Sequence, residues 1–216
     1  SVIVKSLTNT KIRQLYVEGV EADDAIGYMC RYKFKDIRKV IVSSDHDYYQ
    51  LLDTKTLIYS PTLKKFVNKN TVVERYNVSS ENFCLAKSIA GDSSDNIPGI
   101  KGVSYKTFAK MFPEATSSHE MLLDDLFEKA QNKLAEKRTL SLERLAMGEM
   151  LVRRNWRLVR LDTNNLDGGN INKINTICDR KKGVNNKIGM VRFLMKRGIN
   201  TLNIDRLFLA LQTLQR

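Results

Sequence analysis

Cysteine is scarce in this sequence, which has only Cys30, Cys84 and Cys178 among its 216 residues. An odd number of widely spaced cysteines supports neither a disulfide framework nor a CxxC metal-binding pair. The cysteine content therefore fits a protein of a reducing, intracellular compartment.

Long apolar runs are absent as well. No stretch approaches the roughly 18 consecutive apolar residues that a membrane span requires, and no basic segment followed by an apolar one resembles a leader. We expect neither a membrane span nor a signal peptide, and we find no internal repeat and no low-complexity tail. The length suits one sizeable core, or one compact domain with a helical appendage.

Positive charge is what the sequence has in excess. It contains 36 Lys and Arg against 24 Asp and Glu, a formal net charge of +12. Residues 1–100 carry 14 basic and 12 acidic side chains, whereas residues 101–216 carry 22 and 12. Such a surplus favours polyanions such as nucleic acid or an acidic membrane surface. The basic surplus belongs to the C-terminal half.

The first part of the chain shows alternating signals for helix and strand. Apolar residues at helical spacing predict a helix within 21–34, and the run "RKVIVSSDHD" (38–47) predicts a buried strand that ends at solvent. Residues 56–61 and 64–67 read as two shorter strands joined by a tight turn that contains proline.

Strand signals fade after about residue 70, and helical periodicity replaces them. We expect a mostly helical second half in which 161–187 is a long loop with one short helix. The segments with helical periodicity are 81–91, 104–112, 123–138, 141–155, 187–198 and 203–214.

Carboxylates form three clusters, each at an element boundary. Singly, each cluster is ordinary: an acidic helix start, a polar strand end, or a turn closed by an Asp side chain. Ordinary structural roles explain the three clusters together less well, because carboxylates that converge repel one another and acquire raised pKa values unless a cation neutralises them. Oxygen ligands of this kind bind Mg²⁺ or Mn²⁺, and a pair of such ions about 4 Å apart can activate water against a phosphodiester. The clusters are Glu21, Asp23 and Asp24; Asp45 and Asp47; Asp92 and Asp95.

Three motifs, in this order and at these separations, resemble the 5'-nuclease or flap endonuclease family. They are "GVEADDAIGYM" (19–29), "VIVSSDHDYYQLL" (40–52) and "IAGDSSDNIPGIKGVSYKTFAKMF" (89–112). The family includes phage 5'-3' exonucleases, some of them RNase H-like, and the nuclease domain of bacterial DNA polymerase I. The segment "LVRRNWRLVRLD" (151–162) is similar to a weaker motif of the phage members.

The resemblance implies a metal site built from all seven acidic residues, with Mg²⁺ or Mn²⁺ as the cofactor and two ions in a complete site. It implies metal binding by Glu21 and by six aspartates that would also be catalytic: Asp23, Asp24, Asp45, Asp47, Asp92 and Asp95. Asp92 and Asp95 would hold the second ion.

Family members also begin with a strand that ends in a metal-binding aspartate, followed by another such aspartate and a helical arch with basic residues. The first twenty residues of this sequence contain no counterpart of these features. We therefore expect catalysis to need a further N-terminal portion or a second polypeptide that supplies the missing aspartates and the arch. The alternative is a non-catalytic DNA-binding or structural subunit derived from such a nuclease.

The segment at about 81–112 resembles a helix-hairpin-helix, with "PGIKG" as the hairpin. Two glycines let the backbone turn tightly and approach a phosphate, and the following helix directs free N–H groups toward it. The resemblance also implies a K⁺ ion at the hairpin. Arg180, Lys181 and Lys182 are further phosphate candidates, although each is more simply a solvated charge. The predicted DNA-binding residues of the hairpin are Gly99, Ile100, Lys101, Gly102, Ser104 and Lys106.

Taken together, these features predict an α/β protein with a partial parallel-sheet nuclease core, PIN-like, over residues 1–75 and a mainly helical DNA-binding region over 76–216. The predicted function is a structure-specific 5'-nuclease, either a flap endonuclease or a 5'-3' exonuclease. Its partner would be branched, flapped or 5'-ended DNA, or an RNA–DNA hybrid, with no membrane. Its expected location is the cytoplasm, that of the host cell if a phage encodes it.

Overall fold

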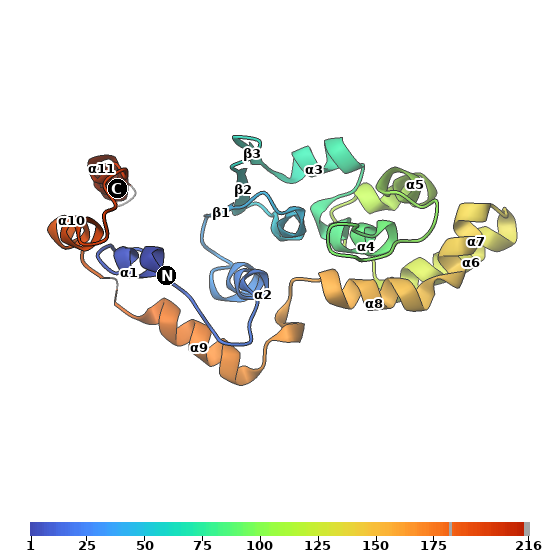
Figure 1. Cartoon of the computed structure of the whole chain (residues 1–216). Coiled ribbons are helices and arrows are strands. Elements are labelled where there is room, and N and C mark those ends of the chain that lie inside the picture. The colour runs from blue at the N-terminus through green and yellow to red at the C-terminus, as the bar shows by residue number, and fades with distance from the viewer. Residues whose placement is uncertain (182, 214–216) are drawn as a thin grey trace. The chain divides into compact units, whose positions relative to one another are not determined.

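The protein forms two compact units, each with its own apolar core. The computed structural model describes residues 1–181 and 183–213 (Figure 1). Unit 1 combines Ser1–Val20 with Leu166–Arg216, and unit 2 is Glu21–Asn165. The sequence-based boundary after residue 75 falls inside α3 of unit 2, and the division of functions at that boundary stays a prediction.

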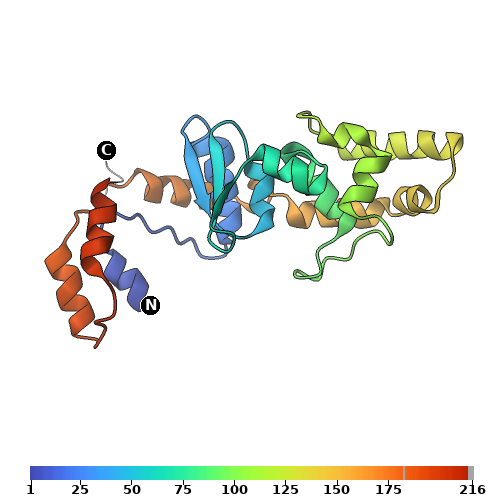
Figure 2. The same ribbon diagram turned by 90° about the horizontal axis from the view of Figure 1, so that it is seen from above.

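Unit 2 contains a three-stranded sheet in the order β1-β2-β3. Strand β1 (Lys39–Val42) pairs in parallel with β2 (Thr56–Ser60), and β2 pairs antiparallel with β3 (Lys65–Val67). Figure 2 shows the three strands side by side. The positions of the strands are confirmed, and β-branched residues such as Ile41 and Ile58 pack into the core from the sheet. The expectation that the first strand is buried was wrong in part, because Val40 and Val42 on the other face of β1 are exposed.

Helices make up the rest of unit 2. Helix α4 starts at the Ser79 cap, whose side chain accepts from the Asn82 amide, and it ends at Gly91 with φ of +79°. It packs against η2 and α8. The helical segments of unit 2 are α2 (Ala22–Tyr28), a π-helical turn η1 (Met29–Lys33), 3₁₀ helix η2 (His46–Leu51), α3 (Lys69–Tyr76), α4 (Ser80–Ala90), α5 (Tyr105–Met111), η3 (Pro113–Thr116), α6 (Leu123–Glu136), α7 (Leu140–Met147), α8 (Glu149–Val159) and η4 (Thr163–Asn165).

Unit 1 is built from both ends of the described chain. It contains α1 (Val2–Leu7), α9 (Gly168–Asp179), α10 (Lys187–Met195) and α11 (Ile204–Thr213). Helix α10 packs on α1 and on α11, around a small core of Met190, Leu194 and Phe208.

The expectation of a long loop over 161–187 was wrong in its extent. Helix α9 covers twelve of these residues, because Asp167 caps it by accepting from the Asn170 amide and because Ile174 and Cys178 bury one face four residues apart. The Asn and Gly content of the segment concealed this spacing. The expectations for Lys182 and Leu214 lie outside the described residues.

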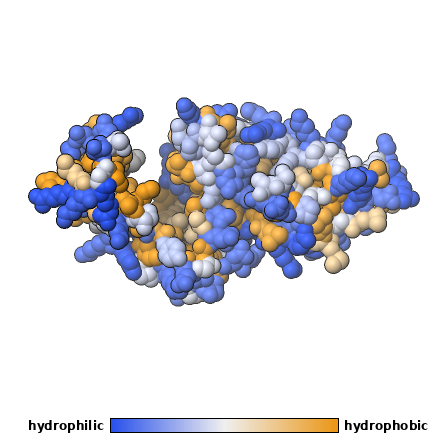
Figure 3. All heavy atoms as spheres, in the orientation of Figure 1, coloured by the Kyte–Doolittle hydropathy of each residue, from blue (hydrophilic) through white to orange (hydrophobic). Residues whose placement is uncertain are grey.

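The surface is predominantly polar. On the face drawn in Figure 3, hydrophilic atoms cover much of the molecule and apolar patches lie between them. Within the described ranges, no helix is long and apolar enough to cross a membrane.

All three cysteines are free and buried, and burial raises the pKa of Cys84 to about 12, so this thiol is unreactive.

Candidate metal and nucleic-acid site

The acidic motifs lie at the ends of regular elements in unit 2. Glu21 is the residue before α2, and Asp23 and Asp24 lie in its first turn. Asp45 caps η2, which follows the carboxyl end of β1 directly. The segment with Asp92 and Asp95 follows α4.

The first cluster brings three carboxylates together. Glu21, Asp23 and Asp24 each offer one oxygen, and these oxygens lie within 4.8 Å of one another. Asp24 is only 5% exposed and accepts a hydrogen bond from Asn165 Nδ2 at 3.1 Å. Burial raises its pKa and the Asp23 charge adds to this, while the Asn165 amide opposes it. A hard divalent cation would relieve this repulsion, so the donor set fits Mg²⁺ or Mn²⁺.

The second cluster surrounds a lysine that the sequence reasoning missed. Lys87 of α4 is 3% exposed, and its Nζ forms ion pairs with Asp47, with Asp92 Oδ2 at 2.7 Å and with Asp95 Oδ2 at 3.6 Å. Its position on the apolar face of α4, five residues before Asp92, is the signal that could have revealed it. The structure therefore brings three of the predicted ligands around one ammonium group.

The charges of Lys87 and of its carboxylate partners stabilise one another. Burial disfavours the Lys87 ammonium, but hydrogen bonds to Asp47 and Asp92 outweigh it and raise the Lys87 pKa above its ordinary value. Burial likewise acts to raise the pKa of Asp92, yet hydrogen bonds from Lys87 and Ser94 hold that pKa well below its usual range. The Asp92 carboxylate is thus kept ionised, as a metal ligand has to be.

Asp45 and Asp47 do not continue β1 as an extended strand end. The two residues belong to the start of a 3₁₀ helix, where an Asp45 oxygen accepts from the Asp47 amide at 2.9 Å. Asp45 is exposed and makes no described ion pair with Lys87. This cap directs the chain away from strand geometry at His46.

Tyr48 lies near both clusters. Its ring is buried, and burial together with the charges of Asp23, Asp45 and Asp47 raises the pKa of its hydroxyl to about 12. Carboxylates at the start of α2 and of η2 therefore act on one neighbouring group.

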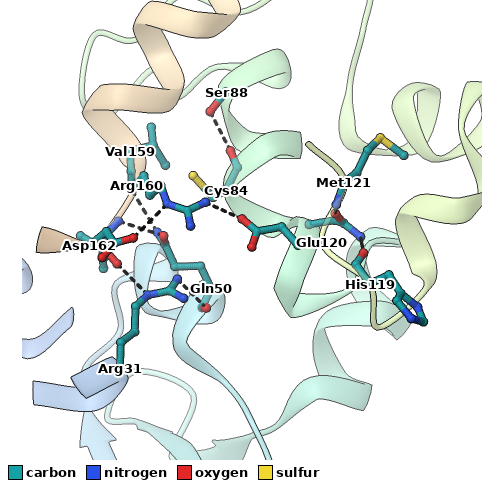
Figure 4. Close-up of polar contacts among 12 residues, drawn as sticks. Arg31, Gln50, Cys84, Ser88, His119, Glu120, Met121, Val159, Arg160 and Asp162 are labelled. Atoms are coloured by element: carbon teal, nitrogen blue, oxygen red, sulfur yellow. Dashed lines mark hydrogen bonds and ion pairs between the residues drawn. The ribbon is translucent and has the colours of Figure 1, made fainter. Parts of the chain in front are cut away.

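Gln50 fixes the backbone beneath Asp47. Its side-chain amide donates to Asp47 O and to Val159 O, both at 2.9 Å, and its Oε1 accepts from the Leu161 amide at 2.9 Å. Figure 4 shows this side chain between Arg31 and the end of α8, where Arg160 pairs with Asp162 and Glu120. Residues 48–50 thus belong to η2, and Gln50 anchors that helix.

The loop after α4 turns back on itself through paired backbone groups. Asp92 and Ile97 exchange two hydrogen bonds of 2.8 Å, and the Ile100 amide donates to Ile89 O at 2.7 Å. Gly91 and Gly99 pass so closely that a Cβ on Gly99 would lie 2.0 Å from Ala90 O. Glycine is required here for close backbone approach.

The predicted DNA-binding residues of this loop fall into two groups. Lys101, Gly102, Ser104 and Lys106 are exposed, and Gly102 has φ of +83°. Ile100 is 7% exposed and packs in the core, so its side chain faces away from solvent. Ser104 caps α5 by accepting from the Thr107 amide at 3.2 Å. The helix-hairpin-helix assignment stays a prediction.

Comparison with known proteins independently supports the resemblance to the 5'-nuclease family. Residues 1–77 match the family model of the 5'-3' exonuclease, N-terminal resolvase-like domain. DNA polymerase I of Bacillus subtilis is 36% identical over 132 residues, which is 59% of this chain and 15% of that protein. The 5'-3' exonuclease of Aquifex aeolicus is 29% identical over 143 residues, 66% of this chain and 49% of that protein. The chain thus spans about half or less of these relatives.

Solved structures agree with this. The 5'-exonuclease of bacteriophage T5 with bound zinc ions superposes with a TM-score of 0.63 and 26% identity, over 76% of this chain and 59% of that one. A flap endonuclease from the same phage, in a complex with DNA and metal ions, gives the same TM-score at 24% identity and so shows the fold.

A small mixed sheet with clustered carboxylates, followed by helices, is the α/β fold to which these comparisons point. Within it, the family model, the curated relatives and the solved structures support the 5'-nuclease family of 5'-3' exonucleases and flap endonucleases. The family resemblance carried by the three sequence motifs is confirmed, and so is the mixed α/β fold.

Proposed function

We propose that this protein is part of a structure-specific 5'-nuclease that hydrolyses DNA phosphodiesters with two divalent metal ions. The observation that carries the proposal is the grouping of six carboxylates into two clusters, one at the start of α2 and one around Lys87. The resemblance to this family makes a nuclease the natural use of such a site.

Each cluster would hold one ion. Glu21, Asp23 and Asp24 offer three hard oxygen donors, and Asp92 and Asp95 with Asp47 offer three more beside Lys87. Bound ions supply an activated water and stabilisation of the leaving oxygen. The chain's own residues orient these ligands: Gln50 holds the Asp47 backbone, Asn165 holds Asp24, and Ser94 holds Asp92.

DNA would approach over the exposed part of the loop after α4. Lys101 and Lys106 supply charge for phosphates, and the exposed Gly102 between them presents backbone without a side chain. Backbone contacts of this kind are independent of sequence and weaken with salt. We therefore propose recognition of branched or 5'-ended DNA by structure, with K⁺ at the hairpin as a further expectation.

A cleavage assay tests this function. The full chain is incubated with a 5'-flap DNA and Mg²⁺ or Mn²⁺, alone and with a polypeptide that carries the N-terminal aspartates and arch of the family. We expect cleavage at the junction in at least one arm, and its loss in Asp92→Ala. Cleavage only in the second arm would identify a divided active site.

The alternative, a DNA-binding subunit without chemistry, predicts a different result. Metal and flap DNA would bind, yet neither arm would cut, and Asp92→Ala would leave DNA affinity unchanged. If neither metal nor flap DNA binds at low salt, both functions are refuted.

A further inference from the structure

Unit 1 carries most of the excess positive charge. Its 71 residues include 13 Lys and Arg against 4 Asp and Glu, a net of +9 out of +12 for the whole chain. Unit 2, which contains both carboxylate clusters, accounts for the remaining +3. Unit 1 therefore has its own electrostatic preference for a polyanion.

A cavity lies within unit 1, between an extended segment and one side of α9. Its volume is about 290 Å³, near the lower end of the roughly 300–1,000 Å³ typical of small-molecule pockets. A cavity of this size suits one nucleotide unit better than a duplex. It is lined by Tyr16, Val17, Glu18, Asn172, Lys173, Thr176, Ile177 and Arg180.

Tyr16 presents an aromatic ring at the cavity. It is 81% exposed, while its neighbour Val17 is 6% exposed and anchors the backbone. None of the described aromatic rings stacks on Tyr16. An exposed ring beside positive charge is the arrangement on which the bases of single strands stack.

Cationic groups flank this ring. Lys173 is an exposed residue of α9, Arg180 is the exposed residue at the carboxyl end of α9, and both line the cavity. Neither forms an ion pair with any residue in 1–181 or 183–213. Arg13 Nη2 donates to Arg180 O at 2.8 Å, which brings a third cation to the same end. Glu18 is the one acidic lining residue. The balance of charge favours an anion.

We infer that this cavity binds single-stranded nucleic acid, with a base stacked on Tyr16 and neighbouring phosphates on Lys173 and Arg180. A duplex fits less well, because its bases are already stacked and unavailable to the ring. The choice of DNA as the nucleic acid rests on the proposed function. It concerns unit 1 alone, so loss of strand binding and loss of cleavage are separate results.

The test measures the affinity of the full chain for a short fluorescein-labelled oligo-thymidylate by anisotropy, over a series of salt concentrations. EDTA is present, so that the carboxylate clusters hold no metal. We expect Tyr16→Ala to weaken binding about tenfold with an unchanged salt slope, because stacking involves no counterion release. Tyr16→Phe should bind like the parent, and Tyr16→Leu like the alanine variant.

The charged residues should respond differently. Lys173→Ala should weaken binding and reduce the slope of log affinity against log salt by about 0.7, the value for one phosphate contact on a single strand. Glu18→Gln should tighten binding by removing repulsion. Lys196→Ala is the matched control, because this exposed cation of unit 1 does not line the cavity, and its effect should be clearly smaller.

Two results would overturn the inference. One is equal weakening by Lys173→Ala and Lys196→Ala with no effect of Tyr16→Ala or Tyr16→Leu, which would mean diffuse charge without a site. The other is a duplex that binds more tightly than the single-stranded oligonucleotide and whose binding Tyr16→Ala weakens to the same degree. The binding measurement is made in EDTA and involves no cleavage, so a failed nuclease assay leaves this result interpretable.

Discussion

Lys87 is the residue on which the second carboxylate cluster depends. A buried ammonium paired with Asp47 and Asp92 compensates charges that would otherwise repel. Its side chain belongs to α4, whereas its partners come from η2 and the following loop. One side chain thus connects three segments of unit 2.

Replacing this lysine tests its contribution. We expect Lys87→Met to lower the free energy of unfolding by about 3 kcal/mol, because removal of one partner leaves buried charges uncompensated. Urea denaturation measures the loss. Lys129→Met is the control, since Lys129 and Glu114 form an exposed pair that should contribute at most about 1 kcal/mol. Equal losses in the two variants would contradict this role.

Asp162 predicts a pH dependence outside the carboxylate clusters. Burial alone would raise its pKa, but hydrogen bonds from Tyr32 and from the Thr163 amide, with the Arg160 charge, hold the pKa below its ordinary value. A lowered folded-state pKa stabilises the fold above the unfolded value of about 4, and this stabilisation is lost as pH falls through the folded value.

Asp162→Asn should therefore cost stability near neutral pH and progressively less below about pH 4. Urea denaturation of parent and variant from neutral to acidic pH measures the difference. Asp36→Asn serves as a comparison, because Asp36 is exposed and, among the described residues, forms an ion pair with Lys55 alone. A difference for Asp162→Asn that stays constant with pH would refute the assignment.

At the scale of elements, local patterns predicted the strands well. The run from Val40 to Val42 is apolar and β-branched, and its ending in polar residues marked the carboxyl end of β1, after which Asp45 and Asp47 lie. Helix α9 was missed because its apolar residues are diluted by Asn and Gly. Side-chain convergence could not be predicted: Lys87 meets its partners only through the packing of α4 on η2.

The loop after α4 gives a prediction about backbone approach. Gly99→Ala would place a Cβ 2.0 Å from Ala90 O and 2.7 Å from Gly91 N, both rigid backbone atoms. We expect a loss of more than about 3 kcal/mol in unfolding free energy, or a displaced loop with weakened metal binding. Thermal unfolding with Mn²⁺ titration detects either effect.

Gly168→Ala is the matched control. A Cβ at this position, the start of α9, would meet nothing within 4 Å. Alanine also favours a helix by up to about 1 kcal/mol over glycine. Stability should stay equal or rise; a loss as large as that of Gly99→Ala would disprove the close-approach explanation.

At the scale of the whole molecule, the two units have separate cores and separate charge. Unit 2 holds the acidic clusters, and unit 1 holds most of the net positive charge. The sequence revealed the basic C-terminal half, but it could not reveal that the first twenty residues join the last fifty in one unit. That association depends on contacts such as Asn186 N to Asn9 O at 2.8 Å.

Independent cores predict independent opening. Phe208→Ala removes a side chain from the small core of Met190 and Leu194, which should cost about 3 kcal/mol locally. Hydrogen exchange should accelerate in α10 and α11 and stay unchanged in α4. Equal acceleration in α4 would show one cooperative unit instead of two.

The central claim is that the two carboxylate clusters bind divalent metal ions. Measuring Mn²⁺ binding to the full chain by electron paramagnetic resonance tests it most directly, because this requires neither cleavage nor a second polypeptide. We predict saturable binding that Asp24→Asn and Asp92→Asn each weaken at least tenfold, while Asp36→Asn leaves it intact. Mn²⁺ binding that is equally weak in the parent and in all three variants would contradict a metal-dependent nuclease site in this chain.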